Sequence, residues 1–412
     1  MKSAIKQFIK NTMPQETSIV NRLLVSTFVA INRLNASSIF SKRYIISENN
    51  YPSELPLLSQ FYNLVNLNYD RFELEDLIEF FELVISPAEK EVNGAVYTPL
   101  YIREFIVKNT LSAFSDEDLM NLKIGDLSCG CGGFFITAAL YINKRTNTPI
   151  NEIISNFYGV DIAAYSIERT QIILNLLCLS HGEDIINQPN LFQANSLEFD
   201  IHSINKVAHN EGLDIIIGNP PYVSSSKISE ESKHLLYKWS VASTGKTDLY
   251  LPFFQLAIEA LKPGGILGYI TVNNFYRSLN GRAFRAYMSE HRYNLQMVDF
   301  GSEQVFKGRS TYTCICLISK IEGNIVYCKK NSHELNSLSA EEFIHIEYRN
   351  LNDFAGWTLC NTVTTNNIRK IESIGTPLGK LFDIKNGFAT LKNDIYLFTP
   401  IRETNKYFLS LI

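Results

Sequence analysis

The sequence has 412 residues, enough for two or three domains with ample apolar core. Its formal net charge of −4 does not by itself indicate a polyanionic partner. The chain has no uncharged apolar run long enough to span a membrane, no start resembling a signal peptide and no CxxC pair among its seven cysteines; we therefore expect a cytoplasmic protein with reduced thiols, without a zinc motif or a thioredoxin-type redox site.

Residues 1–90 have the pattern of a helical N-terminal domain. Apolar residues recur at three- and four-residue spacing in "TSIVNRLLVSTFVAINRL" (17–34), where Thr17 or Ser18 is the candidate N-cap. The stretch "RFELEDLIEFFELVIS" (71–86) repeats this pattern. We expect these segments to form helices that share one apolar core.

Residues 91–330 change to a pattern of strands that alternate with helices. Short strand-like runs occur at 122–128, 156–162, 190–195, 213–218, 264–272 and 293–300, and helical stretches at 163–180 and 249–262 separate several of them. This alternation predicts an α/β fold with a doubly wound, mainly parallel sheet. Two further runs, at 310–320 and 323–330, follow without a helix and predict an antiparallel hairpin at the sheet edge.

The first strand is followed by a glycine-rich loop, "GDLSCGCGGFF" (125–135). In doubly wound sheets, ligands bind at the carboxyl ends of the strands, and glycines let the backbone approach them closely. The loop carries Asp126 before Gly130 and Gly132, and no Lys-Ser/Thr pair follows, so it is not a phosphate-binding P-loop. An acidic residue at this place suits a cationic ligand.

The next two strands also end in polar residues. Asp161 closes "YGVDI" and can accept bonds from both hydroxyls of a ribose, with Ile162 against an adenine face. Its alternative role is the N-cap of the following helix. Asn195 or Ser196, in "QANSLEFD", can bond the edge of the adenine, although ordinary turn chemistry explains this pair equally well.

The fourth strand runs into "GNPPY", and the set of motifs, in this order, resembles a known family. "GAVYTPLYI" (94–102), "DLSCGCGGFF", "GVDI" and "GNPPY" are similar to the gamma-class adenine-specific DNA methyltransferases of restriction–modification systems, both TaqI-like enzymes and Type I modification subunits. The resemblance covers about 90–320 and more weakly extends to 400. It implies a Rossmann-like fold for S-adenosylmethionine-dependent methyl transfer, with a helical N-terminal domain (1–90), a catalytic domain (91–330) and a linker with a partial DNA target-recognition region (331–412).

The resemblance also implies a set of residues that bind S-adenosylmethionine. Tyr97, Thr98 and Pro99 contact its methionine part, while Asp126, Ser128 and the backbone at Gly130 and Gly132 hold the amino group and the ribose side. Asp161 and Ile162 hold the ribose and the adenine. Asn195 stands where the family often has an aspartate, and its amide carbonyl replaces that carboxylate with less charge; Ser196 follows it.

The Asn-Pro-Pro-Tyr motif (219–222) suits methyl transfer to an amino group conjugated with a ring. The lone pair of such a nitrogen is delocalised, and acceptors on its hydrogens redirect it toward the methyl donor. The Asn219 side-chain oxygen and the Pro220 carbonyl are these acceptors, and Pro220 and Pro221 remove backbone donors and fix the chain direction. Tyr222 stacks on the base, which must be flipped out of the DNA duplex. In "SEQVFKGRSTYT", Phe306 matches the second aromatic that holds it; its alternative role is a core residue.

Three alternatives to a DNA adenine methyltransferase stay open. Glutamine-methylating enzymes that act on release factors also use an Asn-Pro-Pro-Tyr motif, although they are shorter and lack the upstream Thr-Pro segment. A catalytically idle DNA-binding subunit with the same fold is the second. Methylation of the cytosine amino group is the third, although it usually goes with a serine in place of Asn219. Cytosine carbon-5 chemistry is not supported, because no Pro-Cys pair is present.

The resemblance implies double-stranded DNA as partner, and the C-terminal part is where we expect the phosphate contacts, although ordinary charge scatter between domains explains its basic balance equally well. Basic residues outnumber acidic ones by 18 to 13 in 261–412, whereas acidic residues dominate by 29 to 20 in 1–260. "TPLGKLFDIKNGFATLKNDIYLF" (376–398) resembles the opening of a TaqI-like recognition domain, and the sequence stops soon after it. We therefore expect specificity to be completed by a separate subunit or by a recognition half missing from this chain.

Overall fold

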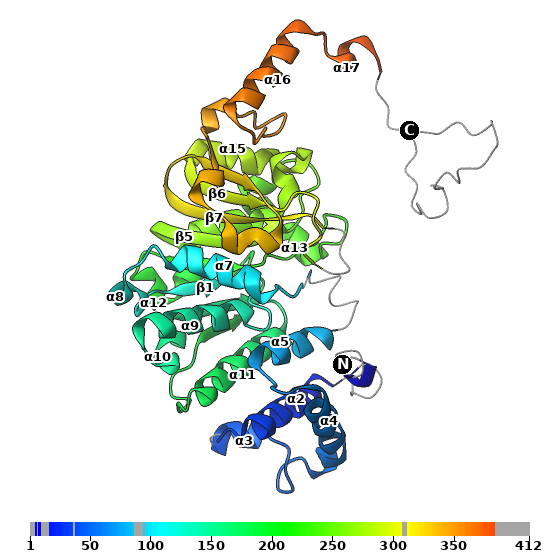
Figure 1. The fold of residues 1–412 in the computed structure, drawn as a ribbon, viewed down its shortest axis with the longest axis vertical. Coiled ribbons are helices and arrows are strands. Elements are labelled where there is room, and N and C mark those ends of the chain that lie inside the picture. The colour runs from blue at the N-terminus through cyan, green and yellow to red at the C-terminus, as the bar shows by residue number, and fades with distance from the viewer. Residues whose placement is uncertain are drawn as a thin grey trace, which may run out of the picture. The chain divides into compact units, whose positions relative to one another are not determined.

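The computed structural model describes residues 5, 7–9, 16–35, 38–85, 94, 96–306 and 311–383 (Figure 1). The chain divides into two compact units, Met1–Asn361 and Thr362–Ile412, and each is described by itself. The domain boundaries expected near residues 90 and 330 stay predictions, since both fall inside the first unit.

The N-terminal helices confirm the expected helical region. They are α2 (Thr17–Asn32), α3 (Ser38–Tyr44), α4 (Leu55–Asn68) and α5 (Leu74–Leu83). Their buried apolar side chains belong to the same core cluster as those of the helices that cover the sheet. One detail was wrong: α2 takes Glu16 as its N-cap, so Thr17 and Ser18 lie within its first turn. α5 instead begins with a capping box between Glu73 and Asp76.

The centre of the first unit is a nine-stranded sheet with the order β3-β2-β1-β4-β5-β7-β6-β8-β9. Neighbours from β3 to β5 are parallel and β7 is antiparallel to both of its neighbours. This topology confirms the predicted doubly wound α/β fold. The strands are β1 (Ile124–Asp126), β2 (Phe157–Asp161), β3 (Asn190–Gln193), β4 (Leu213–Gly218), β5 (Leu261–Val272), β6 (Tyr293–Asp299), β7 (Thr313–Glu322), β8 (Ile325–Lys329) and β9 (Ile344–Ile346).

Helices cover both faces of the sheet, and each face has its own apolar core. In β4, Ile215 and Ile217 join the core formed with α7 (Leu100–Leu111), α9 (Gly133–Thr146) and α11 (Ala164–Ser180), whereas Ile216 joins the core formed with α14 (Tyr250–Ala260) and α15 (Arg282–His291). This follows from the two-residue period of a strand. Shorter helices complete the unit: α8 (Asp116–Leu119), α10 (Ile150–Ile154), α12 (Asn205–Ala208) and α13 (Glu230–Leu235).

The predicted hairpin of 310–320 and 323–330 was wrong. β7 inserts between β5 and β6 and pairs antiparallel with both, while β8 pairs in parallel with β6 and antiparallel with β9. The reason lies in burial: the first six residues of β7 are all buried, which requires a strand covered on both faces and paired on both edges. A sequence without a helix between two strands does not show which strands they pair with.

The second unit contributes α16 (Thr362–Ile374) and α17 (Leu378–Leu381). Of the expected recognition segment 376–398, only residues up to 383 are described, and the rest lies outside the described residues, as does the terminal "YFLSLI". No helix within the described parts of the chain is both long enough and apolar enough to cross a membrane.

Candidate active site

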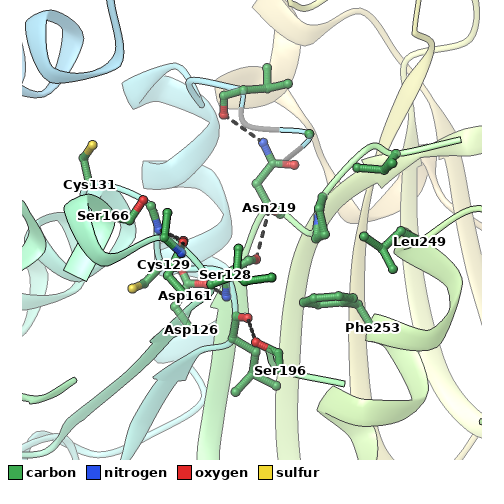
Figure 2. Close-up of a pocket in the computed structure, with 18 of the residues that line it drawn as sticks. Asp126, Ser128, Cys129, Cys131, Asp161, Ser166, Ser196, Asn219, Leu249 and Phe253 are labelled. Carbon is green, nitrogen blue, oxygen red and sulfur yellow. Dashed lines mark hydrogen bonds between the residues drawn. The ribbon is translucent and has the colours of Figure 1, made fainter. Parts of the chain in front are cut away.

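A cavity of about 290 Å³ lies against the carboxyl ends of β1, β2 and β4 (Figure 2). Its wall includes eleven of the residues that the sequence singled out: Tyr97, Thr98, Asp126, Ser128, Gly130, Asp161, Ile162, Asn195, Ser196, Asn219 and Pro221. Pro99, Gly132, Pro220, Tyr222 and Phe306 are not part of its lining. The structure thus brings together residues that are up to 124 positions apart in the chain, although their roles toward a ligand stay predictions.

The glycine-rich loop between β1 and α9 depends on left-handed backbone at two places. Gly130 has φ of +53° and Gly132 has φ of +77°, a region that favours glycine. Gly132 is the N-cap of α9, and a Cβ there would stand 3.0 Å from the Thr170 side chain on α11. The loop is therefore packed directly against α11, with Gly130 on the cavity side.

Asp126, the last residue of β1, places a buried carboxylate in the cavity wall. Its side chain is 2% exposed, and one oxygen accepts from the Ser128 backbone N–H at 3.0 Å. Burial is the main cause that raises the pKa of Asp126 to about 8, and the nearby Asp161 adds to the shift. Desolvation disfavours the ionised form, so a cation bound in this cavity would restore the charge of Asp126.

Asp161, the last residue of β2, holds the glycine-rich loop in place. Its two carboxylate oxygens accept from the backbone N–H groups of Gly130 and Ala163, both at 2.9 Å. Burial raises the pKa of Asp161, while these two hydrogen bonds counteract the rise. The N-cap of α11 is Ala163, so Asp161 is not the N-cap, although it binds the N–H of that residue. Ile162 beside it is 48% exposed on the cavity wall.

Asn195 and Ser196, after β3, already use their side chains within the protein. The Asn195 carbonyl oxygen accepts from the Leu197 N–H at 3.2 Å and its amide nitrogen donates to the Ser232 hydroxyl at 3.1 Å. The Ser196 hydroxyl donates to the Leu127 carbonyl at 2.6 Å. The turn chemistry that the sequence suggested is present, and any contact with an adenine edge would be an additional bond to these atoms.

Asn219 follows β4 directly and shows the most unusual feature of the cavity. Its amide nitrogen donates to the Val96 carbonyl at 3.3 Å and to the Thr98 hydroxyl at 3.0 Å. Its carbonyl oxygen is buried and has no hydrogen-bond partner among the described residues. In Figure 2 a dashed hydrogen bond leaves from the amide nitrogen of Asn219, and none leaves from this oxygen. Because the amide nitrogen faces two acceptors, the orientation of the side chain is fixed with its acceptor free.

The two aromatic residues expected to hold a base contact each other. Tyr222 donates its hydroxyl to the Ile270 carbonyl at 3.1 Å, and its ring meets that of Phe306 edge to face, with the centroids 5.9 Å apart. Phe306 is 3% exposed. Rings in edge-to-face contact leave no room for a planar base between them, so Phe306 packs as a core residue in this structure.

Several residues of the cavity wall were not anticipated from the sequence. The N-terminal helical region supplies Ile78, Glu82 and Ile85, and the other face supplies Leu249 and Phe253. Leu249 and Phe253 are four positions apart, a spacing that marks one face of the predicted helix at 249–262. Nothing in the pattern of 71–86 distinguishes Glu82 from an exposed glutamate.

Comparisons with known proteins support the resemblance drawn from the motifs. Residues 155–306 match the family described as Eco57I restriction-modification methylase. The chain is 27% identical over 381 residues to the Type II restriction enzyme and methyltransferase RM.Eco57I of Escherichia coli, which covers 78% of this chain and 38% of that protein. The resemblance to gamma-class methyltransferases of restriction–modification systems is therefore confirmed, and the chain spans about two fifths of that relative.

Solved structures confirm the fold. A DrdV–DNA complex is similar with a TM-score of 0.60 and 16% identity, over 83% of this chain and 40% of that one. A putative class I S-adenosylmethionine-dependent methyltransferase of Listeria monocytogenes is similar with a TM-score of 0.50 and 13% identity, over 79% of this chain and 93% of that one. Identity at this level speaks for the fold and not for the reaction.

Proposed function

We propose that this chain is the catalytic part of a site-specific DNA methyltransferase that transfers a methyl group from S-adenosylmethionine to the exocyclic amino group of adenine. One observation carries the proposal: the buried Asn219 carbonyl oxygen has no partner among the described residues, in a cavity whose other wall is a glycine-rich loop with a buried carboxylate. Buried acceptors without a partner are rare in native structures. An acceptor held free in this way suits an N–H group that arrives with the substrate.

The cavity wall fits S-adenosylmethionine by its chemistry. Asp126 is a buried acid whose raised pKa marks a place that favours a cation, and the cofactor carries positive charge. Gly130 lets the backbone approach a ligand, and Ile162, Leu249 and Phe253 supply apolar surface for an adenine ring. S-adenosylmethionine, when bound, supplies an electrophilic methyl group on a sulfonium. We assign the cofactor-binding roles to the predicted residues on this basis.

The chain itself contributes positioning and hydrogen-bond acceptors. Asn219 accepts from one hydrogen of the target amine through its free oxygen, and the Pro220 carbonyl accepts from the other. These preorganised dipoles stabilise the positive charge that develops on the nitrogen. Tyr222 holds the plane of the flipped base, with its hydroxyl anchored on Ile270. Phe306 leaves its contact with Tyr222 when the base enters. The nitrogen loses its extra proton after transfer, so a strong base is not required.

The proposed partner is double-stranded DNA, together with a recognition part that supplies specificity. The relative from Escherichia coli is a restriction enzyme and methyltransferase, and the similar DrdV structure is a complex with DNA. Support from this chain is the excess of basic residues in 261–412. Salt dependence of DNA binding would report how many phosphates they contact.

The deciding experiment supplies labelled S-adenosylmethionine to the purified chain with mixed bacterial DNA, and reads the label after digestion to nucleosides. A release factor serves as a parallel acceptor. Label in N6-methyladenine supports the proposal, and label in the release factor assigns the chain to the glutamine-methylating alternative. Cofactor binding without transfer to either acceptor, repeated with a recognition subunit from a related system, favours the catalytically idle subunit.

A further inference from the structure

The N-terminal helix α5 reaches the candidate active site from outside the catalytic sheet. Ile78 and Glu82 on α5, and Ile85 just after it, line the cavity, and one turn before Ile78 the Glu75 side chain contacts two further residues of the cavity wall. The Glu75 carboxylate accepts from the Tyr97 hydroxyl and forms a salt bridge with Arg103 on α7. Helix α5 therefore belongs to the site itself and does more than support it from a distance.

Arg103 connects helix α5 to the segment that precedes α7 and to the first turns of α9. Its side chain is 2% exposed. Besides the bond to Glu75, its guanidinium donates to the Thr98 carbonyl at 3.1 Å, the Gly133 carbonyl at 2.5 Å and the Thr137 hydroxyl at 3.1 Å. A planar guanidinium has donors in a fixed fork, so these partners hold one another in a set geometry. Removing the Glu75 charge would leave a buried cation without its acid.

Thr98 connects Arg103 to Asn219. Its carbonyl accepts from Arg103, and its hydroxyl accepts from the Asn219 amide nitrogen at 3.0 Å. The second acceptor for that nitrogen, the Val96 carbonyl, stands farther away at 3.3 Å. Without the Thr98 hydroxyl, the amide nitrogen would keep only the more distant Val96 carbonyl as its acceptor, so the side chain would be held less firmly with its oxygen toward the target amine. The stretch 96–98 thus decides which atom of Asn219 faces the substrate.

We propose that Glu75 is a positioning residue for methyl transfer: through Arg103 and Thr98 it fixes the Asn219 amide with its oxygen toward the target amine. The inference rests on the proposed function and deepens it, because it assigns a part in catalysis to the N-terminal helical region. A positioning role predicts a loss in the rate of transfer with cofactor affinity retained. A purely structural role predicts that the transfer rate and the cofactor affinity fall together with the stability of the folded chain.

The Thr98→Val and Thr98→Ser variants test the last link of this chain. Valine keeps the shape and the backbone carbonyl but removes the hydroxyl, while serine restores it. We expect Thr98→Val to lower the single-turnover rate of methyl transfer by about tenfold or more, the range for one lost active-site hydrogen bond. Thr98→Ser should recover most of the rate that Thr98→Val loses; because Thr98 also has a proposed contact with the cofactor, all rates are compared at saturating S-adenosylmethionine. An unchanged rate in Thr98→Val, or a loss that appears only in the cofactor Kd, overturns the proposal.

The Glu75→Ala and Glu75→Gln variants test the first link, with Glu104→Gln as the matched control. Glu104 is the exposed neighbour of Arg103 on α7 and loses the same charge. Glutamine keeps an acceptor for Arg103, so the transfer rate should fall in the order Glu104→Gln, Glu75→Gln, Glu75→Ala, with the first at the parental value. If Glu75→Ala does not fold, Glu75→Gln and the two Thr98 variants still test the proposed link. Equal rates for Glu75→Gln and Glu104→Gln contradict the proposed link.

Neutron crystal structures of the parent chain and of Thr98→Val, in which the N–H groups of the Asn219 amide are observed directly, separate this inference from the proposed function. We expect the Asn219 amide to turn away from its parental orientation in the variant. An amide that keeps the same pose without the Thr98 hydroxyl overturns the positioning role, whatever the chain methylates. Conversely, a turned amide in a chain that labels only the release factor retains the link from Thr98 to Asn219 and rejects DNA as substrate.

Discussion

The Asn219 amide nitrogen donates to the Thr98 hydroxyl at 3.0 Å, across 121 residues of sequence, and this bond leaves the Asn219 carbonyl oxygen buried without a partner among the described residues. An unsatisfied buried acceptor costs about 1–3 kcal/mol. The fold therefore holds this oxygen at a cost in stability, which is understandable if a substrate N–H satisfies it during each reaction.

Replacing Asn219 by alanine should remove most of the transfer activity and leave cofactor binding intact. Loss of one preorganised acceptor lowers the rate of comparable reactions by about 10²–10³. The measurement is the single-turnover rate of methyl transfer to adenine, with cofactor Kd from calorimetry. Tyr222→Ala should behave similarly, because the ring holds the base. Equal loss of cofactor affinity in both variants would mean that the roles of the motif are misassigned.

Replacing Phe306 should impair base flipping in DNA and leave the cofactor affinity unchanged. In the structure the Phe306 ring packs edge to face against the Tyr222 ring. Phe306 must therefore move before a flipped base can stack on Tyr222. We expect Phe306→Ala to weaken the fluorescence change of 2-aminopurine at the target position and to lower the transfer rate, with unchanged cofactor Kd. Phe306→Tyr is the control that keeps an aromatic ring. A variant with normal base flipping but poor folding would show that Phe306 is a core residue alone.

Cofactor affinity should depend on pH through Asp126. In the cofactor-free chain its pKa is about 8, so the carboxyl is largely protonated at pH 7 and a cationic ligand must displace a proton. Affinity for S-adenosylmethionine should therefore rise from pH 6 to pH 8 and level off above that. Calorimetry in buffers of different ionisation enthalpy would detect the released proton. Asp126→Asn should bind more weakly and without proton release; release that persists in this variant contradicts the assignment to Asp126.

The same shift gives a stability prediction of defined sign. The pKa of Asp126 in the folded chain lies above its ordinary value of 3.8, so its contribution to stability is fully present below about pH 4 and is lost as pH rises toward 8. Asp126→Asn keeps the neutral form at every pH. The Tm of the cofactor-free variant relative to the parent should thus increase between pH 5 and pH 9, as measured by calorimetry. A constant difference in Tm would argue against a buried ionisation at this residue.

Gly218 should tolerate no side chain, because it lies directly against the Asp126 carboxylate. A Cβ there would stand 2.7 Å from an Asp126 carboxylate oxygen and 3.3 Å from the Tyr269 ring. We expect Gly218→Ala to weaken cofactor binding about tenfold or more through displacement of Asp126. Gly264→Ala is the matched control, since a Cβ at Gly264 meets nothing within 4 Å and carries only the strain of its φ of +77°. Similar cofactor affinity in both variants would rule out this clash as the cause.

Local sequence patterns predicted the elements well and their partners less well. The six strand-like runs from 122 to 300 match β1 to β6, because the pattern of apolar residues that marks a strand is a local property of the sequence. The hairpin was wrong because Thr313–Ile318 gains more by burial between β5 and β6 than by pairing with its neighbour in sequence. The N-cap of α2 is Glu16, which makes no side-chain capping bond, so the capping preferences of Thr17 and Ser18 did not locate the start of this helix.

The sequence by itself determined the class of the fold and the chemical types at the strand ends, because glycines at positive φ, prolines and acids each carry their own conformational or charge preference. Only the tertiary structure decided what these groups are free to do. Both carboxylate oxygens of Asp161 accept hydrogen bonds from backbone N–H groups, whereas the side-chain oxygen of Asn219 has no partner among the described residues. Hydrogen bonds between segments far apart in sequence make that difference, and no local pattern encodes them, as Glu75 on α5 illustrates.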